Sequence, residues 1–262
     1  PYESLLYVNS AATSLRVAKE HVATADRNRK ESDAVVLASR YRGWLNLATS
    51  LRIGILSADM RHHPVAQTLL GVLQAIRSQS LHVHVVVFSM CPEKPNDKVQ
   101  QAIRSQVDRW HNIHATTDEA AAQMVADEGI HVLLEMQGHT LHRRIGIALR
   151  RPAPVAISMQ GFPASTGMPP ETLPYLLGDN IVLPPELATP DVVSEQVMYM
   201  PFSFIACGYR RSLSIPMPEP NKADQSDPGG TRGMTIPRLP QQSGSGSAAS
   251  LSIQRRLSWV DV

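Results

Sequence analysis

Short apolar runs alternate with amphipathic segments from residue 51 to residue 159. The runs are rich in Val, Ile and Leu, which favours β-strands, whereas the intervening segments repeat apolar residues every three or four positions, as helices do. Predicted strands cover 51–57, 81–89, 110–114, 131–136 and 155–159. Predicted helices cover 64–76, 96–108, 118–128 and 143–149. This alternation predicts a Rossmann-like, doubly wound α/β fold, in which helices cover both faces of a parallel sheet.

The two ends of the chain differ in character from this central part. Residues 1–49 carry helical patterns interrupted by a polar stretch, and we assign them to a helical segment that precedes the α/β domain of residues 50–211. Residues 212–262 are dominated by Pro, Gly and Ser, a composition that cannot build an apolar core, so we expect a disordered tail. Because the first residue is Pro1 and not Met, we expect that the natural amino terminus has been lost and that the chain is a fragment.

Charge and cysteine content argue against several classes of protein. Lys and Arg number 25 and Asp and Glu number 23, which leaves a formal net charge of +2. This balance is too mild for a nucleic acid or an anionic membrane as partner, since both need clustered basic residues. No apolar run approaches the ~20 residues of a membrane-spanning helix, and no signal peptide opens the chain. Cys91 and Cys207 lie far apart, so we expect no disulfide framework and a reducing cytoplasmic or nuclear location.

Ligands of doubly wound sheets bind beyond the carboxyl ends of the strands, so the residues that follow the predicted strands are the first candidates for a site. His63 ends the polar turn after the first strand, and its imidazole can accept a proton near neutral pH. Residues 137–140 combine a Gly that permits close backbone approach with a Thr hydroxyl. Residues 160–163 contain a Gly whose backbone N–H groups can face an anion. The plainer alternatives are a surface histidine, a turn with a capping Thr and a strand-ending loop.

Two pairs of histidines raise the possibility of a metal site. His111 and His114 are three positions apart, and so are His139 and His142. Zinc would need cysteine or carboxylate partners nearby, and none cluster there, so we expect no metal site. The chain has no GxGxxG or GxxxxGK[ST] phosphate loop and no GxSxG nucleophile motif. The residues by themselves therefore indicate no nucleotide site.

A series of short motifs gives a more specific indication. The series runs LRIGILSADMRHHPV from Leu51, DEGIHVLL from Asp127, GHT from Gly138, RPAPV from Arg151, GFPASTG from Gly161, PPE from Pro184 and EQVMYMP from Glu195. In this order, the motifs resemble the catalytic region of the protein O-GlcNAc transferase and SPINDLY family over about residues 50–210. The pair RPAP and GFP is the most specific part of the resemblance.

The resemblance implies the amino-terminal lobe of a two-lobed GT-B glycosyltransferase. Members of the family transfer N-acetylglucosamine (GlcNAc) from UDP-GlcNAc to Ser or Thr hydroxyls of intracellular proteins, with inversion and without a metal or other cofactor. Tetratricopeptide repeats upstream recruit the protein substrates. Some plant members instead use GDP-fucose, and the sequence GHT, in place of GYT, slightly favours a resemblance to these members. The implied partners are acceptor proteins and a second, nucleotide-binding lobe that this chain lacks, so we expect the chain alone to be inactive.

The family's functional residues carry over onto three loops and one strand. The resemblance implies catalytic roles for His63, the histidine of the H-P motif, which has been regarded as a base, and for His111. It implies substrate binding by residues of two further loops: His139, Thr140, Gly161, Phe162 and Pro163.

Several positions depart from the family pattern. Ile55 and Met60 replace a Tyr and a Phe, Leu173–Tyr175 replaces the sequence IDY, and Phe202 stands where a polar residue is usual. These departures keep open a different class, a non-catalytic lobe that binds partner proteins or an acceptor peptide. A gene-model fragment with no function of its own is a further alternative.

Overall fold

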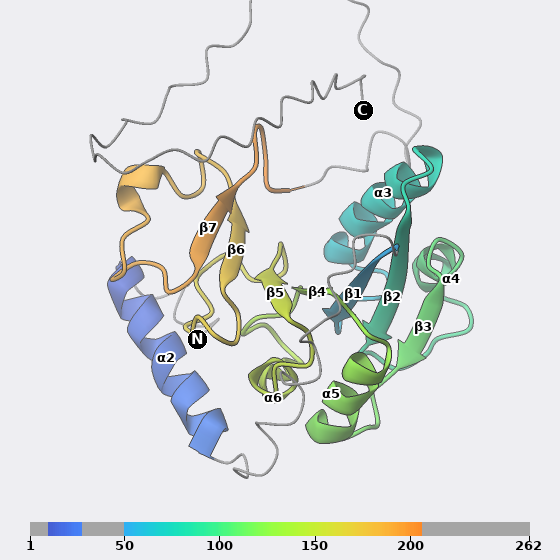
Figure 1. The fold of residues 1–262 in the computed structure, drawn as a ribbon, viewed down its shortest axis with the longest axis horizontal. Coiled ribbons are helices and arrows are strands. Elements are labelled where there is room, and N and C mark those ends of the chain that lie inside the picture. Colours follow the sequence, from blue (N-terminus) through green and yellow to red (C-terminus); the bar gives the residue numbers. More distant parts are fainter. Residues whose placement is uncertain (1–9, 28–49, 206–262) are drawn as a thin grey trace, which may run out of the picture. The chain divides into compact units, whose positions relative to one another are not determined.

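The computed structural model describes residues 10–27 and 50–205. Residues 50–205 form a seven-stranded sheet in the order β3-β2-β1-β4-β5-β6-β7, and all neighbouring strands are parallel (Figure 1). The strands are β1 (Leu51–Ser57), β2 (Val83–Ser89), β3 (Arg109–Asn112), β4 (Val132–Glu135), β5 (Val155–Ser158), β6 (Tyr175–Gly178) and β7 (Gln196–Tyr199). The prediction of a doubly wound, Rossmann-like α/β fold is therefore confirmed. The helical pattern at 35–49 and the tail at 212–262 lie outside the described residues.

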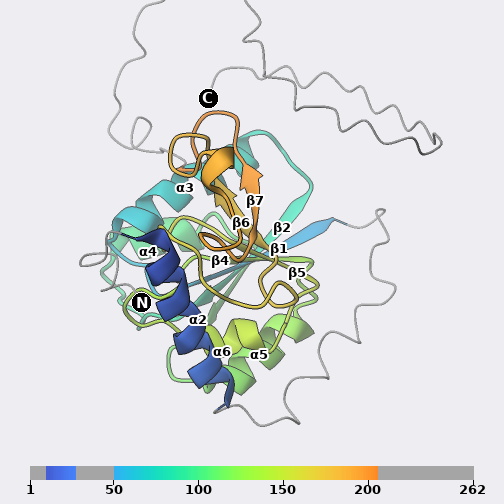
Figure 2. The same ribbon diagram turned by 90° about the vertical axis from the view of Figure 1, so that its left-hand side faces the viewer.

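Helices cover both faces of the sheet (Figure 1, Figure 2). The helices are α2 (Ala11–Arg27), α3 (Pro64–Ser78), α4 (Lys98–Arg104), α5 (Asp118–Asp127) and α6 (Ile145–Leu149), and a 3-10 turn, η3 (Pro185–Leu187), follows β6. Ile55 and Val87 point toward the core formed with α3 and α4. Leu56 and Phe88 point toward the core formed with α2, α5 and α6. This alternation is the period of two that a strand buried on both faces must have.

Capping residues explain where three of the helices begin. The His63 side chain caps α3 through Val65, and Pro64 occupies the first turn, where its missing N–H costs nothing. Asp97 caps α4 and also accepts a hydrogen bond from the backbone N–H of His62. Thr117 caps α5. The predicted helix at 96–108 is therefore shorter at both ends, because it can begin only after the Asp97 cap and ends at Arg104.

The last two strands were not predicted. β6 and β7 are only four residues long, and alternate residues of β6 remain partly exposed. β3, β4 and β5 are equally short, but helical patterns separate them in the sequence, whereas the described residues between β5 and β6 contain no helix and those between β6 and β7 contain only η3. They extend the sheet beyond β5 and move its edge from β5 to β7.

The strand order places β1 and β4 side by side, with β5 next to β4. The chain winds in one direction from β1 to β3 and in the other from β4 to β7, so the point between β1 and β4 is the topological switch point where ligands of such sheets bind. In the described ranges, no helix has both the length and the apolar composition needed to span a bilayer.

Candidate active site

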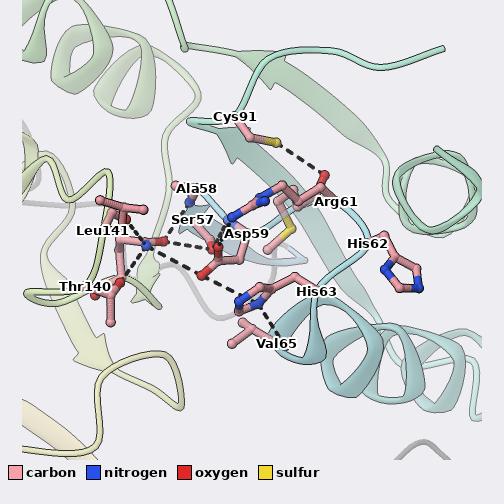
Figure 3. Close-up of polar contacts among 12 residues, drawn as sticks. Ser57, Ala58, Asp59, Arg61, His62, His63, Val65, Cys91, Thr140 and Leu141 are labelled. Atoms are coloured by element: carbon pink, nitrogen blue, oxygen red, sulfur yellow. Dashed lines mark hydrogen bonds and ion pairs between the residues drawn. The ribbon is translucent and has the colours of Figure 1, made fainter. Parts of the chain in front are cut away.

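Three loops leave the carboxyl ends of the adjacent strands β1, β4 and β5. We call them the β1 loop (58–63), the β4 loop (136–142) and the β5 loop (159–168). They contain the predicted site residues except His111. Polar side chains of the β1 and β4 loops meet between β1 and β4 (Figure 3).

The side-chain amide of Gln137 connects the β1 and β4 loops. Its Oε1 accepts hydrogen bonds from the backbone N–H of Ala58 at 2.8 Å and from the Ser57 hydroxyl at 3.3 Å. Its Nε2 donates to Thr140 Oγ1 at 2.6 Å and lies 3.5 Å from Asp59 Oδ2. Gln137 is 1 % exposed and Asp59 is 6 % exposed. This buried network fixes the relative position of the two loops.

His63 lies at the edge of this network and is half-buried. Its Nδ1 accepts a hydrogen bond from the backbone N–H of Val65 at 3.3 Å and lies 3.7 Å from Asp59 Oδ2. An Nδ1 that accepts a backbone N–H carries no proton, so the neutral ring carries its proton on Nε2. In this state, His63 can donate a hydrogen bond from Nε2 to a ligand oxygen, and it cannot take a proton at that atom.

Glu135, the last residue of β4, fixes the backbone conformation of the β4 loop that follows it. Its two carboxyl oxygens accept hydrogen bonds from the backbone N–H groups of Gln137 at 3.0 Å and Gly138 at 2.8 Å. Burial raises the pKa of Glu135 to about 7, although these two hydrogen bonds act in the opposite direction. The carboxyl group holds the turn at Gly138, where φ is +50°, and so directs the Gln137 side chain toward Ala58.

The β5 loop packs directly against the β4 loop. A Cβ on Gly161 would lie 1.5 Å from the carbonyl oxygen of Met136, so only glycine fits there. A Cβ on Gly138 would lie 2.4 Å from Phe162 Cβ. Thr68 of α3 donates a hydrogen bond to Gln160 Oε1 at 3.0 Å. The loops that sequence analysis singled out separately are thus in mutual contact.

Phe162 and Pro163 face a cavity of about 420 Å³. Leu15 of α2 and Leu177 of β6 also line it, and most of its surface is apolar. Phe162 is buried, whereas Pro163 is exposed. The two residues therefore lie on the α2 and β6 side of the site, while Thr140 lies within the network with Gln137.

Two buried carboxyl groups fix the end of the β5 loop and the chain that follows β6. Glu195 is 4 % exposed and accepts hydrogen bonds from Ser165 Oγ at 2.6 Å, from the backbone N–H of Thr166 at 2.7 Å and from the Thr166 hydroxyl. Asp179 accepts backbone hydrogen bonds from Ile181, Val182 and Phe204, and these bonds, that of Val182 first, lower its pKa. Glu195 therefore holds Ser165 and Thr166 of the β5 loop, whereas Asp179 fixes the segment that follows β6 and joins it to Phe204.

The structure places His139 in the interior. Its side chain is 0 % exposed and its Nε2 donates to the Thr166 carbonyl at 2.6 Å. Burial lowers its pKa to about 4, so the ring is neutral at neutral pH. A side chain with no exposed surface has no direct access to a ligand in this structure, so any contribution of His139 to binding acts through the loops that it touches.

His111 does not join the site. It lies on β3, where its ring stacks on Phe88 with centroids 5.4 Å apart, and its Nε2 lies 2.7 Å from Glu128 Oε1. Phe88 belongs to the core under α5, whereas His63 begins α3 on the opposite face of the sheet. Glu128 also pairs with Arg52 and Arg109, so His111 belongs to a charged cluster. The catalytic role implied for His111 receives no support from its position.

His111 and His114, one of the two histidine pairs considered as zinc ligands, face different partners. His114 Nδ1 faces the Met90 carbonyl oxygen at 3.0 Å, away from the Glu128 partner of His111. Among the described residues, no group of three or more His, Cys, Asp or Glu side chains is placed to hold a metal ion.

Sequence reasoning missed three carboxyl or amide groups that organise the site: Gln137, Glu135 and Glu195. Glu135 offered a signal, because a charged residue in an otherwise apolar buried strand is unusual and requires hydrogen-bond partners. Gln137 was part of a candidate segment, but only the fold shows that its amide reaches the β1 loop.

An all-parallel doubly wound sheet with a histidine, a buried acid and a buried amide at its switch point defines a Rossmann-like lobe with a ligand site at its carboxyl edge. The sequence of residues 1–217 matches glycosyl transferase family 41, and the chain belongs to this family.

Individual relatives are consistent with the family. The chain is 26% identical over 179 residues to a probable UDP-N-acetylglucosamine–peptide N-acetylglucosaminyltransferase, SEC, of Arabidopsis thaliana, a match that covers 68% of this chain and 18% of that protein. It is 26% identical over 220 residues to the UDP-N-acetylglucosamine–peptide N-acetylglucosaminyltransferase of Caenorhabditis elegans, covering 81% of this chain and 18% of that protein. The matched region thus spans about a fifth of these relatives' length.

A solved structure agrees with the sequence relatives. The fold is similar to that of a mutant O-GlcNAc transferase of Thermobaculum terrenum, with a TM-score of 0.54 and 28% sequence identity. The similarity covers 60% of this chain and 29% of that one.

Proposed function

We propose that this chain forms the amino-terminal lobe of a protein glycosyltransferase that transfers GlcNAc from UDP-GlcNAc to Ser or Thr hydroxyls of acceptor proteins. The observation that carries the proposal is the meeting of His63 with the Asp59–Gln137–Thr140 network at the switch point of a family 41 chain. The names of the relatives from Arabidopsis thaliana and Caenorhabditis elegans support the choice of GlcNAc and of a peptide acceptor.

In the proposed reaction, the acceptor oxygen forms a bond to the anomeric carbon while the bond from that carbon to the diphosphate breaks, with inversion. The hydroxyl proton passes to solvent as the new bond forms, and the nucleoside diphosphate leaves with the electron pair of the broken bond. With Nδ1 occupied by the Val65 N–H, His63 donates from Nε2 and so orients an oxygen of the sugar or the acceptor. To act as a base, His63 would first have to release Val65. We therefore assign it an orienting hydrogen bond in the active site.

The proposal needs no metal or other cofactor. It assigns the nucleotide to a second lobe outside this chain, which would also neutralise the charge of the leaving diphosphate. It places the protein in a reducing cytoplasmic or nuclear setting, where acceptor proteins are its partners. GDP-fucose is the alternative donor, because the sequence GHT resembles that of some plant members of the family. The chain is also 28% identical over 174 residues to the probable UDP-N-acetylglucosamine–peptide N-acetylglucosaminyltransferase SPINDLY of Arabidopsis thaliana, whose name does not favour fucose.

A second candidate function is a lobe that binds partner proteins without catalysis. Exposed apolar side chains on and near β7 favour it: Phe202 is 75 % exposed, Ile181 is 83 % exposed and Met198 is 42 % exposed. Apolar surface of this kind is typical of an interface with another lobe or another protein.

Sugar transfer by the protein expressed from the full-length transcript tests the proposal. The protein is incubated with an acceptor protein and either UDP-GlcNAc or GDP-fucose, and products are measured by intact mass. An added GlcNAc mass that a His63→Ala variant loses supports the proposal, and an added fucose mass selects the alternative donor. No transfer from either donor by a folded, soluble protein rejects the glycosyltransferase and leaves the partner-binding lobe.

A further inference from the structure

Helix α2 makes unusually close contact with the β5 loop. Gly167 has a φ of +68°, and a Cβ there would lie 2.7 Å from the backbone nitrogen of Lys19 and 2.9 Å from the carbonyl carbon of Ala18. Ala18 is 1 % exposed. The loop backbone therefore packs directly on the helix backbone, with no side chain between them that could absorb a movement.

His139 lies between α2 and the same loop. Its ring meets His21 of α2 edge to face, with centroids 5.2 Å apart and an interplanar angle of 74°. On the other side it meets Phe162 in the same manner, at 5.2 Å and 79°. Its Nε2–H donates to the Thr166 carbonyl oxygen, and its Nδ1 has no partner. One buried ring thus contacts the helix, the start of the β5 loop and its far end.

The contact with α2 is closed by a hydrogen bond from the β4 side. Arg143, just after the β4 loop, donates from Nε to His21 Nε2 at 3.0 Å. His21 therefore accepts at Nε2, which carries no proton. Desolvation by burial, followed by the nearby Arg143 charge, lowers the pKa of the His21 ring. The ring pair and this hydrogen bond hold α2 to His139 within the GHT sequence and to Arg143 just after it.

We infer that His139 is a positioning residue that couples helix α2 to the β4 and β5 loops, so that a displacement of α2 changes the distance between Gln137 and Phe162. Gly161 extends this coupling from the β5 loop to the β4 loop. Its backbone lies against the Met136 carbonyl, so one loop cannot move toward the other without displacing it. The inference rests on the proposed function for its catalytic consequence, but the physical coupling does not depend on it. A conformational change in a segment that precedes α2 would then shift the β4 and β5 loops without any contact with a substrate.

Hydrogen exchange on the full chain tests the coupling directly. His21→Ala removes the contact from α2, and Glu20→Ala, an exposed neighbour on the same helix, is its control. In His21→Ala, backbone amides of 138–140, 160–162 and 164–168 exchange faster by on the order of tenfold, while those of α3 do not change. Unchanged loop exchange in His21→Ala, or the same increase in Glu20→Ala, overturns the coupling.

Two substitutions of similar size separate the roles of the His139 ring. His139→Gln keeps an N–H donor for the Thr166 carbonyl, whereas His139→Leu removes it. We expect faster loop exchange in His139→Leu and partial recovery in His139→Gln. Equal exchange in the two variants would show that the hydrogen bond has no part in the coupling and that packing alone holds the loops.

Kinetics on the protein from the full-length transcript test the catalytic consequence. The His21→Ala variant is expected to raise KM for the nucleotide sugar by on the order of tenfold, about 1.4 kcal/mol, because the β4 and β5 loops that it loosens carry the residues implied to bind substrate. A purely structural role lowers Tm and leaves this KM and kcat per folded molecule unchanged, which would overturn the positioning role. If the wild-type protein transfers no sugar, the proposed function fails, and the exchange experiment alone decides the coupling.

Discussion

Gln137 Oε1 accepts a hydrogen bond from the backbone N–H of Ala58 at 2.8 Å, although the two residues belong to loops that leave different strands. The bond is possible because β1 and β4 are neighbours in the sheet while they are separated in sequence by β2 and β3. Gln137 is 1 % exposed, so water cannot replace the bond if the amide is lost.

Gln137→Leu is expected to destabilise the chain. The substitution leaves the Ala58 N–H without a buried acceptor and removes the donor to Thr140, and each such loss typically costs about 1–3 kcal/mol. Urea unfolding at neutral pH measures the change. Gln79→Leu, at an exposed position after α3, is the matched control and is expected to leave the midpoint nearly unchanged. Equal midpoints for the two variants would contradict the bridging role of Gln137.

His63 has a structural role and a proposed chemical role that two substitutions separate. His63→Ala removes the cap of α3 and is expected to cost about 1 kcal/mol of stability, whereas Asn is a good cap and should restore most of it. Both variants lose the imidazole Nε2–H, so both should lose sugar transfer in the full-length protein. Retained transfer in His63→Asn would show that the histidine only caps the helix.

The raised pKa of Glu135 predicts that the free energy of unfolding of the chain depends on pH. Its pKa in the folded chain is about 7, above the ordinary value of 4.5, so the folded state binds the proton more tightly than the unfolded state. Stability from this group is present below pH 4.5 and is lost as the pH rises through 7. The free energy of unfolding of the wild type relative to Glu135→Gln should therefore fall by about 3 kcal/mol between pH 4.5 and pH 8. Denaturant titrations across this range measure it, and a constant difference would contradict the burial of the carboxyl.

Gly161 tolerates no side chain, in contrast to Gly178. A Cβ at Gly161 would lie 1.5 Å from the Met136 carbonyl oxygen, whereas one at Gly178 would meet only Val197 Cγ1, at 3.2 Å. Gly161→Ala must push the β5 loop away from the β4 loop, so we expect a large loss of stability and of sugar transfer. Gly178→Ala is expected to have a small effect on both. Thermal unfolding and sugar-transfer assays measure both effects. Similar results for the two variants would contradict the close approach of Gly161 to the Met136 carbonyl.

The order of strands and helices up to β5 could be read from the sequence, because each element carries its own periodicity and each loop its own polar residues. The location of the site beyond the strand ends followed from the fold class. β6 and β7 could not be predicted, because the alternation of strand and helix stops after β5 and only their pairing with the existing sheet edge marks these runs as strands.

The roles of individual residues depended on tertiary structure. His63, Thr140 and Gly161 were identified from sequence, and the structure brings their loops together. The resemblance implied a catalytic role for His111 and substrate binding by His139, but one pairs with Glu128 at the sheet edge and the other is enclosed between α2 and Phe162. The sequence by itself determined the family and the set of candidate loops, since these depend on local order and motif. Only the tertiary structure decided which side chains reach the site, because burial and the partner across a loop depend on strand neighbours that lie far apart along the chain.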